Sequence, residues 1–360
     1  MKTHLDCSGI SPESAMTAAM LPVVSVVIPV YNEEPFIHRC LEAVLKQDYP
    51  IDKLEIIIAD GMSNDRTREI VALFQSRHSN IRLIDNPKRI VPTGLNRAIA
   101  SAQGEIIVRL DGHCEYPKDY VRRVVELRQQ TGADNIGGVL VPVGKNYVQR
   151  AVAAAYYSRV GLGGAALKAS AGAETIREVD AVHGGCWRRE RLLEVGGFDE
   201  EMVRNQDDEL SFRLRKTNGK IFQCLSLRVV YHVRASFEKL FLQFVQYGFW
   251  KVHVIRRHPR QASLRHVAPA GFVLALTTLA MLSLLYPTAL LCFLVLAGVY
   301  LTTLTVASLM QMRGEIKQIP GVVIALICMH IGYGFGFVLS CPQYVRQRSG
   351  TSRLFAESTR

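Results

Sequence analysis

An aspartate and a histidine stand two residues apart at the end of a short apolar run. The run covers residues 106–110, follows Gly104, and leads directly into Asp111-Gly-His113. Such a run, bounded by Gly and Pro, is typical of a buried strand in a parallel sheet. Ligands of open α/β sheets bind beyond the carboxyl ends of the strands. A carboxylate and an imidazole there are suitable ligands for Mn²⁺ or Mg²⁺ carrying a diphosphate, although a plain turn explains the pair better when it is taken alone.

Two earlier apolar runs end in polar residues in the same way. The run at 23–29 ends at Pro29 and is followed by Tyr31 and Glu33, and the run at 56–59 is followed by Asp60. A carboxylate at a strand end can accept hydrogen bonds from a uracil N–H or a ribose hydroxyl, which suits Asp60, with help from Glu33. Each acid taken alone is better explained by a turn or a helix cap. Three polar strand ends on one edge of a sheet favour a nucleotide site.

Alternating strands and helices must position these groups. We expect strands at 23–29, 56–59, 81–84 and 106–110, with helices at 35–47, after residue 63 and at 93–102 between them. This order predicts an α/β fold with parallel pairing and right-handed crossovers. A further helix, at 206–217, begins with acidic residues.

The composition separates a soluble region from a membrane region. The 360 residues carry a net charge of +11, and long uncharged apolar runs begin only at residue 267. Basic residues gather at 251–265, just before the first of these runs. This position favours anionic lipid headgroups as the partner and argues against nucleic acid. The eight cysteines form no Cys-x-x-Cys pair, which indicates reduced thiols and neither a disulfide framework nor a zinc site.

The pattern predicts five regions along the chain. They are a disordered leader at 1–22, a catalytic domain at 23–236, an amphipathic interface segment at 237–266, about three transmembrane helices at 267–341 and a basic tail at 342–360. The expected spans are 267–285, 288–310 and 319–341. The positive-inside rule places the soluble domain in the cytoplasm, but three spans then leave the basic tail outside. Either the Gly-rich third segment does not fully cross the membrane, or the basic tail is an exception to the positive-inside rule.

Several motifs together resemble a known enzyme family. They are Val-Val-Ile-Pro-Val-Tyr-Asn-Glu-Glu34, Ile-Ala-Asp-Gly-x-Ser-x-Asp-x-Thr67, the Asp-x-His turn, Gly-Gly-Phe-Asp-Glu200 and Gln-Asp-Asp-Glu-Leu210. In this order they resemble the inverting glycosyltransferases of family 2, and most closely those that act in succinoglycan biosynthesis. The resemblance covers residues 23–250 and implies a GT-A fold, a Rossmann-like mixed sheet that binds nucleotide sugars.

The resemblance also assigns roles on the donor side. Pro29, Tyr31 and Glu33 would border the base, Asp60 would bind uracil or ribose, Asp111 would face the ribose or diphosphate, and Lys88 would assist at the diphosphate. His113 would stand with Asp111 at the metal position, where most of the family has an acid. An imidazole there favours Mn²⁺ over Mg²⁺.

A single acid is expected to act as the catalytic base. Inversion is one displacement at the anomeric carbon, so a carboxylate must take the proton of the attacking hydroxyl. Asp207 matches the base of the family, and the resemblance, not the spacing, distinguishes it from Asp208. Gln206 replaces the usual preceding acid. Without the resemblance, these acids would be ordinary first-turn residues favoured by the helix dipole.

Other residues are expected on the acceptor side. These are His183, Gly184, Gly185, Trp187, Asp208, Arg234, Gln246 and Trp250. Glycines let a backbone approach a substrate closely, and Trp187 could stack on a sugar or be a core residue. Gln246-x-x-x-Trp250 resembles an incomplete Gln-x-x-Arg-Trp motif of membrane polysaccharide synthases, and Trp250 could equally be an interface anchor.

The resemblance therefore predicts a membrane-anchored inverting enzyme. It would move a hexose, with glucose expected, from a UDP-sugar to a polyprenyl-diphosphate-linked glycan during exopolysaccharide synthesis. The enzyme would be a multi-pass protein of the bacterial inner membrane, with other exopolysaccharide biosynthesis proteins as partners. Two alternatives stay open: a processive polysaccharide synthase, and a non-catalytic subunit that binds sugar nucleotides.

Overall fold

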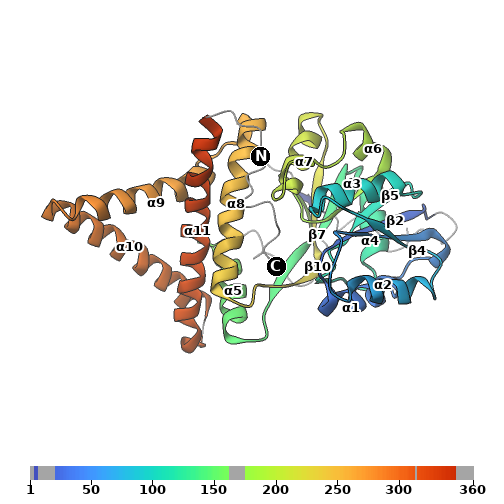
Figure 1. Cartoon of the computed structure of the whole chain (residues 1–360), viewed down its shortest axis with the longest axis horizontal. Coiled ribbons are helices and arrows are strands. Elements are labelled where there is room, and N and C mark those ends of the chain that lie inside the picture. Colours follow the sequence, from blue (N-terminus) through green and yellow to red (C-terminus); the bar gives the residue numbers. More distant parts are fainter. Residues whose placement is uncertain (1–3, 7–20, 162–174, 313, 346–360) are drawn as a thin grey trace. The chain divides into compact units, whose positions relative to one another are not determined.

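The chain forms two compact units in a computed structural model that describes residues 4–6, 21–161, 175–312 and 314–345 (Figure 1). The first unit comprises Met1–Val141 and Ala169–Tyr231, and the second comprises Pro142–Lys168 and His232–Arg360.

A mixed sheet organises the first unit. Its strands are β1 (His4–Asp6), β2 (Val24–Val30), β3 (Leu54–Asp60), β4 (Ile81–Asp85), β5 (Ile106–Arg109), β6 (Cys114–Glu115), β7 (Asn135–Val143), β8 (Thr175–Glu178), β9 (Gly185–Arg188) and β10 (Ile221–His232). They follow the order β1-β8-β10-β7-β9-β5-β2-β3-β4, and β6 pairs with β10. Strands β4, β3, β2 and β5 are parallel, as the sequence predicts. Strand β9 is antiparallel to β5.

Helices cover this sheet. They are α1 (Glu34–Leu45), α2 (Thr67–Gln75), α3 (Val91–Ser101), α4 (Tyr120–Thr131), α6 (Arg189–Glu194) and α7 (Gln206–Lys216). Leu95 of α3 and Leu210 and Leu214 of α7 share one core with Val27 and Ile57 of the sheet. A fully buried leucine stabilises a fold by about 1.5–3 kcal/mol. The core therefore fixes α7, and with it the acids of its first turn, against the sheet.

Within the expected leader, the structure describes residues 4–6 as strand β1, and the disorder of the leader stays a prediction. Strand β1 pairs antiparallel with β8 at the edge of the sheet. The edge strand β8 thereby gains a partner for its unpaired backbone groups. Residues 1–3 and 7–20 of the expected leader, and 346–360 of the expected tail, lie outside the described residues.

Helices make up the second unit. They are α5 (Tyr147–Tyr157), α8 (Phe237–Arg257), α9 (Leu264–Leu282), α10 (Pro287–Gln311) and α11 (Ile319–Val345). Figure 1 shows α8 and α11 side by side. A Cβ added to Gly248 would lie 1.9 Å from the carbonyl oxygen of Tyr333, and one added to Gly336 would lie 1.9 Å from that of Val245. Helices α8 and α11 therefore pack closely together, and the place of α8 in the membrane interface stays a prediction.

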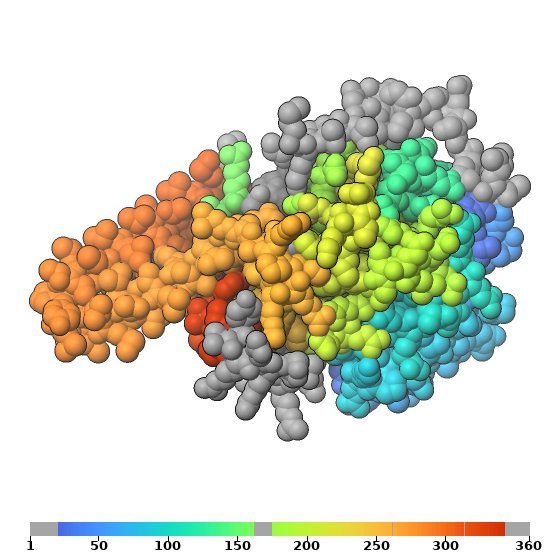
Figure 2. All heavy atoms as spheres, turned by 90° about the horizontal axis from the view of Figure 1, so that it is seen from above, coloured from blue at the N-terminus to red at the C-terminus, as the bar shows by residue number. Residues whose placement is uncertain are grey.

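Three helices are long and apolar enough to cross a membrane. They are Leu264–Leu282, Pro287–Gln311 and Ile316–Pro342, close to the expected spans. Figure 2 shows the α9–α10 hairpin extending from the other helices of its unit. Its apolar side chains are uncovered, for example Leu284 at 84% and Val299 at 62% exposure. Exposed apolar surface on this scale marks an interaction with lipid or protein.

Candidate active site

Three adjacent parallel strands end at one edge of the sheet, where the sequence predicts a nucleotide site. Strand β2 lies between β3 and β5, with Val30 paired to Asp60 and Val27 paired to Arg109. Neighbouring strands lie about 4.7–4.9 Å apart. The residues that follow β2, β3 and β5 therefore share a narrow region at the carboxyl ends of these strands.

Four charged residues meet at the end of β5, and we call them the Arg109 cluster: Arg109, Asp111, His183 and Asp207. Arg109 Nη1 lies 2.5 Å from Asp207 Oδ1, and Arg109 Nε lies 3.0 Å from Asp111 Oδ1. His183 Nε2 lies 2.9 Å from Asp111 Oδ2, and its Nδ1 lies 3.9 Å from Asp207 Oδ2. One guanidinium and one imidazole therefore link the two acids that the sequence places 96 residues apart.

Local backbone geometry brings His183 to the cluster. Gly184 and Gly185 have φ values of +67° and +133°, and an added Cβ on Gly185 would lie 2.2 Å from Asn135 Oδ1. Residues with a side chain rarely adopt such φ values. Because Gly185 is paired with Arg109 across β9 and β5, the turn before β9 delivers His183 to the end of β5.

Asp207 is held by α7. It lies in the first turn of this helix, where three acids face the positive end of the helix dipole. Asn205, just before the helix, has a φ of +61°. Non-glycine residues in this region are uncommon and cluster at functional sites.

Burial and charge set the pKa values of the cluster in opposite directions. Burial raises the pKa of Asp207 above its ordinary value of 3.8, against the lowering effect of Arg109 and His183. Burial also acts to raise the pKa of Asp111, but Arg109 and His183 lower it well below 3.8. Burial acts to lower the pKa of His183, but Asp111 and Asp207 raise it to about 10. Asp207 is thus the acid in the cluster with the greater affinity for a proton, as a base requires.

Asp60 belongs to a second group at the same edge. The residue is fully buried, and its carboxylate accepts hydrogen bonds from Ser63 Oγ at 2.5 Å and from Arg68 Nη1 at 2.6 Å. Arg68 also pairs with Asp85 at 2.9 Å. Nearby, Gly61 adjoins Tyr31, because an added Cβ would lie 3.2 Å from the Cβ of Tyr31.

Few of the described side chains near the proposed metal position could bind a metal ion. No group of three His, Cys, Asp or Glu side chains surrounds a metal position within the described residues. An open site needs only one or two protein ligands, because substrate phosphates and water supply the others. The sequence proposes Asp111 and His113 as such a pair. In the structure both oxygens of Asp111 contact Arg109 or His183, and His113 Nδ1 lies 3.4 Å from the buried Glu33. The carboxylate and imidazole donors therefore suit a divalent cation carried by a diphosphate.

Some predicted site residues lie elsewhere. Lys88 is exposed and pairs with Glu200 at 2.8 Å. Trp187 is 1% exposed and packs edge-on against Phe198 in the core, so it has no surface for a sugar, and the core interpretation is correct. Asp208 follows Asp207 on α7 and is half-buried.

Three predicted acceptor residues belong to the second unit, and their role stays a prediction. Arg234 Nε donates to Gln243 Oε1 at 3.2 Å. Gln246 and Trp250 are 2% and 3% exposed, so Trp250 is packed within helices and is not an anchor in the membrane interface.

Arg109 is not among the site residues predicted from the sequence. Its signal was an arginine inside an otherwise apolar run, two residues before Asp111. A buried arginine nearly always has a partner. That partner is an acid pair, and Arg109 is only 3% exposed.

Comparisons with known proteins agree with the geometry. Residues 25–191 match the model of glycosyl transferase family 2. The succinoglycan biosynthesis protein ExoA of Rhizobium meliloti is 34% identical over 246 residues, which cover 68% of this chain and 73% of ExoA. A dolichyl N-acetyl-α-D-glucosaminyl phosphate 3-β-D-2,3-diacetamido-2,3-dideoxy-β-D-glucuronosyltransferase of Methanococcus voltae is 25% identical over 319 residues, covering 87% of this chain and 95% of that one.

A solved structure shares the fold. The mannosyltransferase PcManGT from Pyrobaculum calidifontis, in complex with GDP-Man and Mn²⁺, has a TM-score of 0.59 and 20% identity, covering 87% of this chain and 88% of that one. The sheet is of the GT-A type that the sequence predicts. Together with the motifs at the carboxyl ends of β2, β3 and β5, these relatives establish that the chain belongs to glycosyltransferase family 2.

Proposed function

We propose that this glycosyltransferase inverts the anomeric centre as it moves a hexose from a UDP-sugar to a polyprenyl-diphosphate-linked glycan. The observation that carries the proposal is the Arg109 cluster, in which Asp207 is fixed beside Asp111 at the carboxyl edge of the sheet. The name of the Methanococcus voltae relative supports a lipid-linked acceptor, because it specifies a dolichyl phosphate sugar. Likeness to a succinoglycan biosynthesis protein supports a place in exopolysaccharide synthesis. Glucose as the transferred sugar remains the expectation from the sequence resemblance.

Asp207 is the proposed base of the reaction. Its carboxylate takes the proton from the acceptor hydroxyl while that oxygen attacks the anomeric carbon and the bond to the diphosphate breaks. Arg109 holds one oxygen of Asp207 at 2.5 Å, which fixes the direction of the other. This contact supports a defined orientation of the proposed base, as proximity catalysis requires.

Asp60, Glu33 and Tyr31 are the proposed contacts of the uridine. Asp60 is oriented by Ser63 and Arg68, so its acceptor oxygens are held in place at the end of β3. Asp111 and His113 would hold a divalent cation, for which Mn²⁺ is favoured by the imidazole. The bound cation would offset the negative charge on the departing diphosphate. The fold neighbour was crystallised with Mn²⁺, which supports this assignment.

We place the catalytic domain on the cytoplasmic side of the bacterial inner membrane. The basic residues before α9, together with the apolar α9–α10 hairpin, support membrane attachment near a lipid-linked acceptor. A processive synthase is less well supported, because the position of the motif arginine is taken by Phe249, which is 1% exposed.

The test replaces Asp207 by Asn in the full-length enzyme. Transfer from labelled UDP-hexose to lipid-extracted acceptors should be abolished, while UDP-hexose affinity stays near that of the wild type. His113→Ala, in contrast, should retain a base and lose most of the response to Mn²⁺. Turnover that survives Asp207→Asn, or an unchanged Mn²⁺ titration in His113→Ala, would remove that residue from its proposed role.

A further inference from the structure

A cavity of about 450 Å³ opens at the edge of the sheet opposite the Arg109 cluster. Its lining residues are Arg128, Gln129, Gly132, Ala133, Asp134, Arg188, Glu190, Arg191 and Glu194. The register of β5 and β9 fixes its place: Arg188 pairs with Ile106 at the start of β5, whereas Gly185 pairs with Arg109 at the end. The cavity is therefore separate from the site at the carboxyl ends of the strands.

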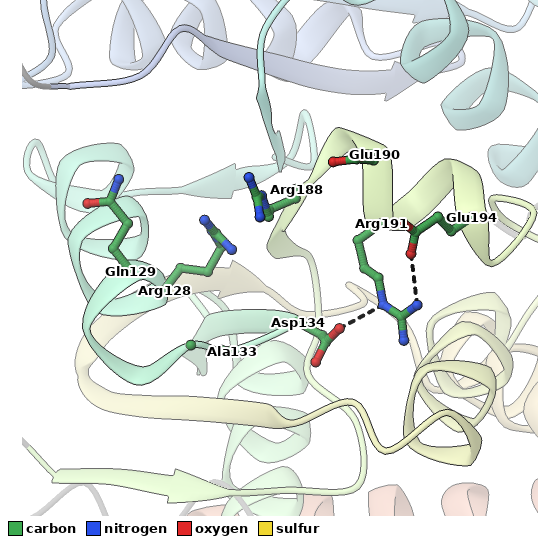
Figure 3. A pocket seen from close by; sticks show the side chains of 9 residues that line it. Arg128, Gln129, Ala133, Asp134, Arg188, Glu190, Arg191 and Glu194 are labelled. Atoms are coloured by element: carbon green, nitrogen blue, oxygen red, sulfur yellow. Dashed lines mark hydrogen bonds and ion pairs between the residues drawn. The ribbon is translucent and has the colours of Figure 1, made fainter.

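Arg128 is the unusual residue of this cavity. It lies in the last turn of α4 and is 9% exposed. Within the described residues its Nε has no hydrogen-bond partner, and no ion pair involves its guanidinium. Figure 3 shows this guanidinium directed into the cavity, next to the side chain of Arg188. A buried charge without a partner is costly, so a counter-ion in the cavity would stabilise the fold.

Most of the acids around the cavity already have a cation. Arg191 pairs with Asp134 at 2.8 Å and with Glu194 at 3.0 Å, and these contacts are drawn in Figure 3. Its remaining nitrogen donates to Thr217 Oγ1 at 2.6 Å. Arg191 is thus neutralised and forms one wall, and neither Asp134 nor Glu194 is directed at Arg128.

Arg188 is the second cation available to a ligand. It lies 3.6 Å from Glu105, and both side chains are more than half exposed, so water screens this pair. Glu190 at the rim is also exposed, and its negative charge is screened in the same way. The buried part of the cavity is therefore positive.

We propose that Arg128 and Arg188 bind the phosphate group of an anionic ligand at this edge of the sheet. Guanidinium groups bind phosphate oxygens through paired N–H donors. The cavity lies within the usual size range of small-molecule sites, so it accommodates a phosphate carried by a larger molecule. The bound phosphate completes the charge balance of Arg128, for which the described part of the chain supplies no counter-ion.

The test measures thermal unfolding of the full-length protein in detergent, with inorganic phosphate or with chloride at equal ionic strength. A ligand that binds only the folded state raises Tm in a saturable way. Phosphate should raise Tm of the wild type, and Arg128→Met should lose this rise. Arg188→Gln, a change at an exposed residue, should need at least tenfold more phosphate for the same rise.

Arg122→Met is the matched control. Arg122 lies on the same helix, but pairs with Asp48 at 3.0 Å away from the cavity, so its variant should respond to phosphate like the wild type. A parallel titration with a short-chain phosphatidic acid distinguishes a free phosphate from a lipid headgroup. A response to the lipid alone that depends on Arg128 assigns the site to a headgroup.

Two outcomes would overturn the proposal. One is the absence of any saturable rise in Tm with either ligand. The other is an equal increase of Tm with phosphate in the wild type and in Arg188→Gln. This comparison tests the proposal even if Arg128→Met fails to fold. Phosphate bound at the donor site would give a rise that neither variant changes, so it cannot be mistaken for this cavity.

Discussion

Arg109 links the two acids that we propose for the active site. It is a positioning residue, since it is the last residue of β5 and contacts both Asp207 and Asp111. Removing it would leave two carboxylates, the buried Asp111 and the partly buried Asp207, close to His183 alone. The cation has a second effect, because its charge lowers the pKa of Asp207, which burial raises.

This effect predicts a shift in the pH profile of Arg109→Met. A base works only when deprotonated, so kcat/KM falls as the pH drops below the pKa of Asp207. The loss of a cation that lowers this pKa moves the acid limb to higher pH, by about one to three pH units. Steady-state assays across pH measure the limb directly.

Arg109→Lys serves as the control for this variant. Lysine keeps the charge and loses the two-pronged geometry. We expect its acid limb to stay near that of the wild type while kcat decreases. An acid limb at the same pH in Arg109→Met and wild type would show that Asp207 is not the titrating base.

Sequence reasoning singled out the acids of the candidate site but not the contacts that link them. Asp60, Asp111 and Asp207 follow recognisable motifs. The ion pair between Arg109 and Asp207 joins residues 98 positions apart, and it exists only because α7 packs onto β5 through the core. For Trp187 the sequence left a sugar contact and a core position open, since no local pattern states which face of a short strand is buried.

The glycines of α11 left open in the sequence whether this helix fully crosses the membrane, and in the structure they lie at close helix contacts. An added Cβ on Gly332 or Gly336 would meet backbone atoms of α8, at 2.8 Å from Phe241 and 1.9 Å from Val245. An added Cβ on Gly334 would lie 2.3 Å from the carbonyl oxygen of Pro269 on α9. Small residues at this spacing let two helices pack closely on two faces of α11. The sequence shows small residues, but not which neighbours they admit.

Gly336→Ala should therefore destabilise the second unit. The new methyl group would overlap the backbone of α8, and overpacking of this kind costs about 1–3 kcal/mol. Thermal unfolding in detergent, followed by the fluorescence of Trp250, measures the loss. Trp250 is a suitable probe because it lies on α8 and is buried.

Gly298→Ala on α10 is the control for this substitution. No atom lies within 4 Å of an added Cβ at this position. Alanine in the interior of a helix is favoured over glycine by about 0.5–1 kcal/mol. Tm should stay the same or rise, and a loss equal to that of Gly336→Ala would contradict the packing argument.

The early strands were predictable and the later ones were not, for a physical reason. Strands β2, β3 and β5 are buried on both faces and appear in the sequence as continuous apolar runs. Strand β10 alternates between buried and more exposed positions over its second half, and β9 has only four residues. Short strands of this kind are defined by their partners, which local sequence does not specify.

For the whole molecule, the exposed apolar surface of the α9–α10 hairpin implies insertion into lipid. Leu294 lies within α10 and is 56% exposed. An arginine near the middle of a transmembrane helix costs about 2.5–3.5 kcal/mol of insertion free energy. Leu294→Arg should therefore reduce the alkali-resistant membrane fraction.

Leu284→Arg provides the matched control. Leu284 is 84% exposed and lies in the turn between the two helices, where an arginine can reach water. Its membrane fraction should stay close to that of the wild type. Equal loss in both variants would mean that the hairpin is covered by protein instead of lipid.

The charges flanking the helices predict the orientation of this hairpin. Arg256, Arg257 and Arg265 precede or open α9, and Lys317 follows α10. Helix α10 would be about 37 Å long at 1.5 Å per residue, enough to cross the roughly 30 Å hydrocarbon core. The positive-inside rule then places the turn at Leu284 outside and the segment at Glu315 in the cytoplasm.

Cysteine labelling in intact cells tests this orientation. The exposed Cys292 and Cys341 are first replaced by serine, because they would react with the reagent. A membrane-impermeant maleimide should then label Leu284→Cys in intact cells and Glu315→Cys only after permeabilisation. The reverse pattern would place the basic segment before α9 outside, which contradicts a cytoplasmic supply of UDP-sugar. Labelling of both in intact cells would show that α10 does not cross the membrane.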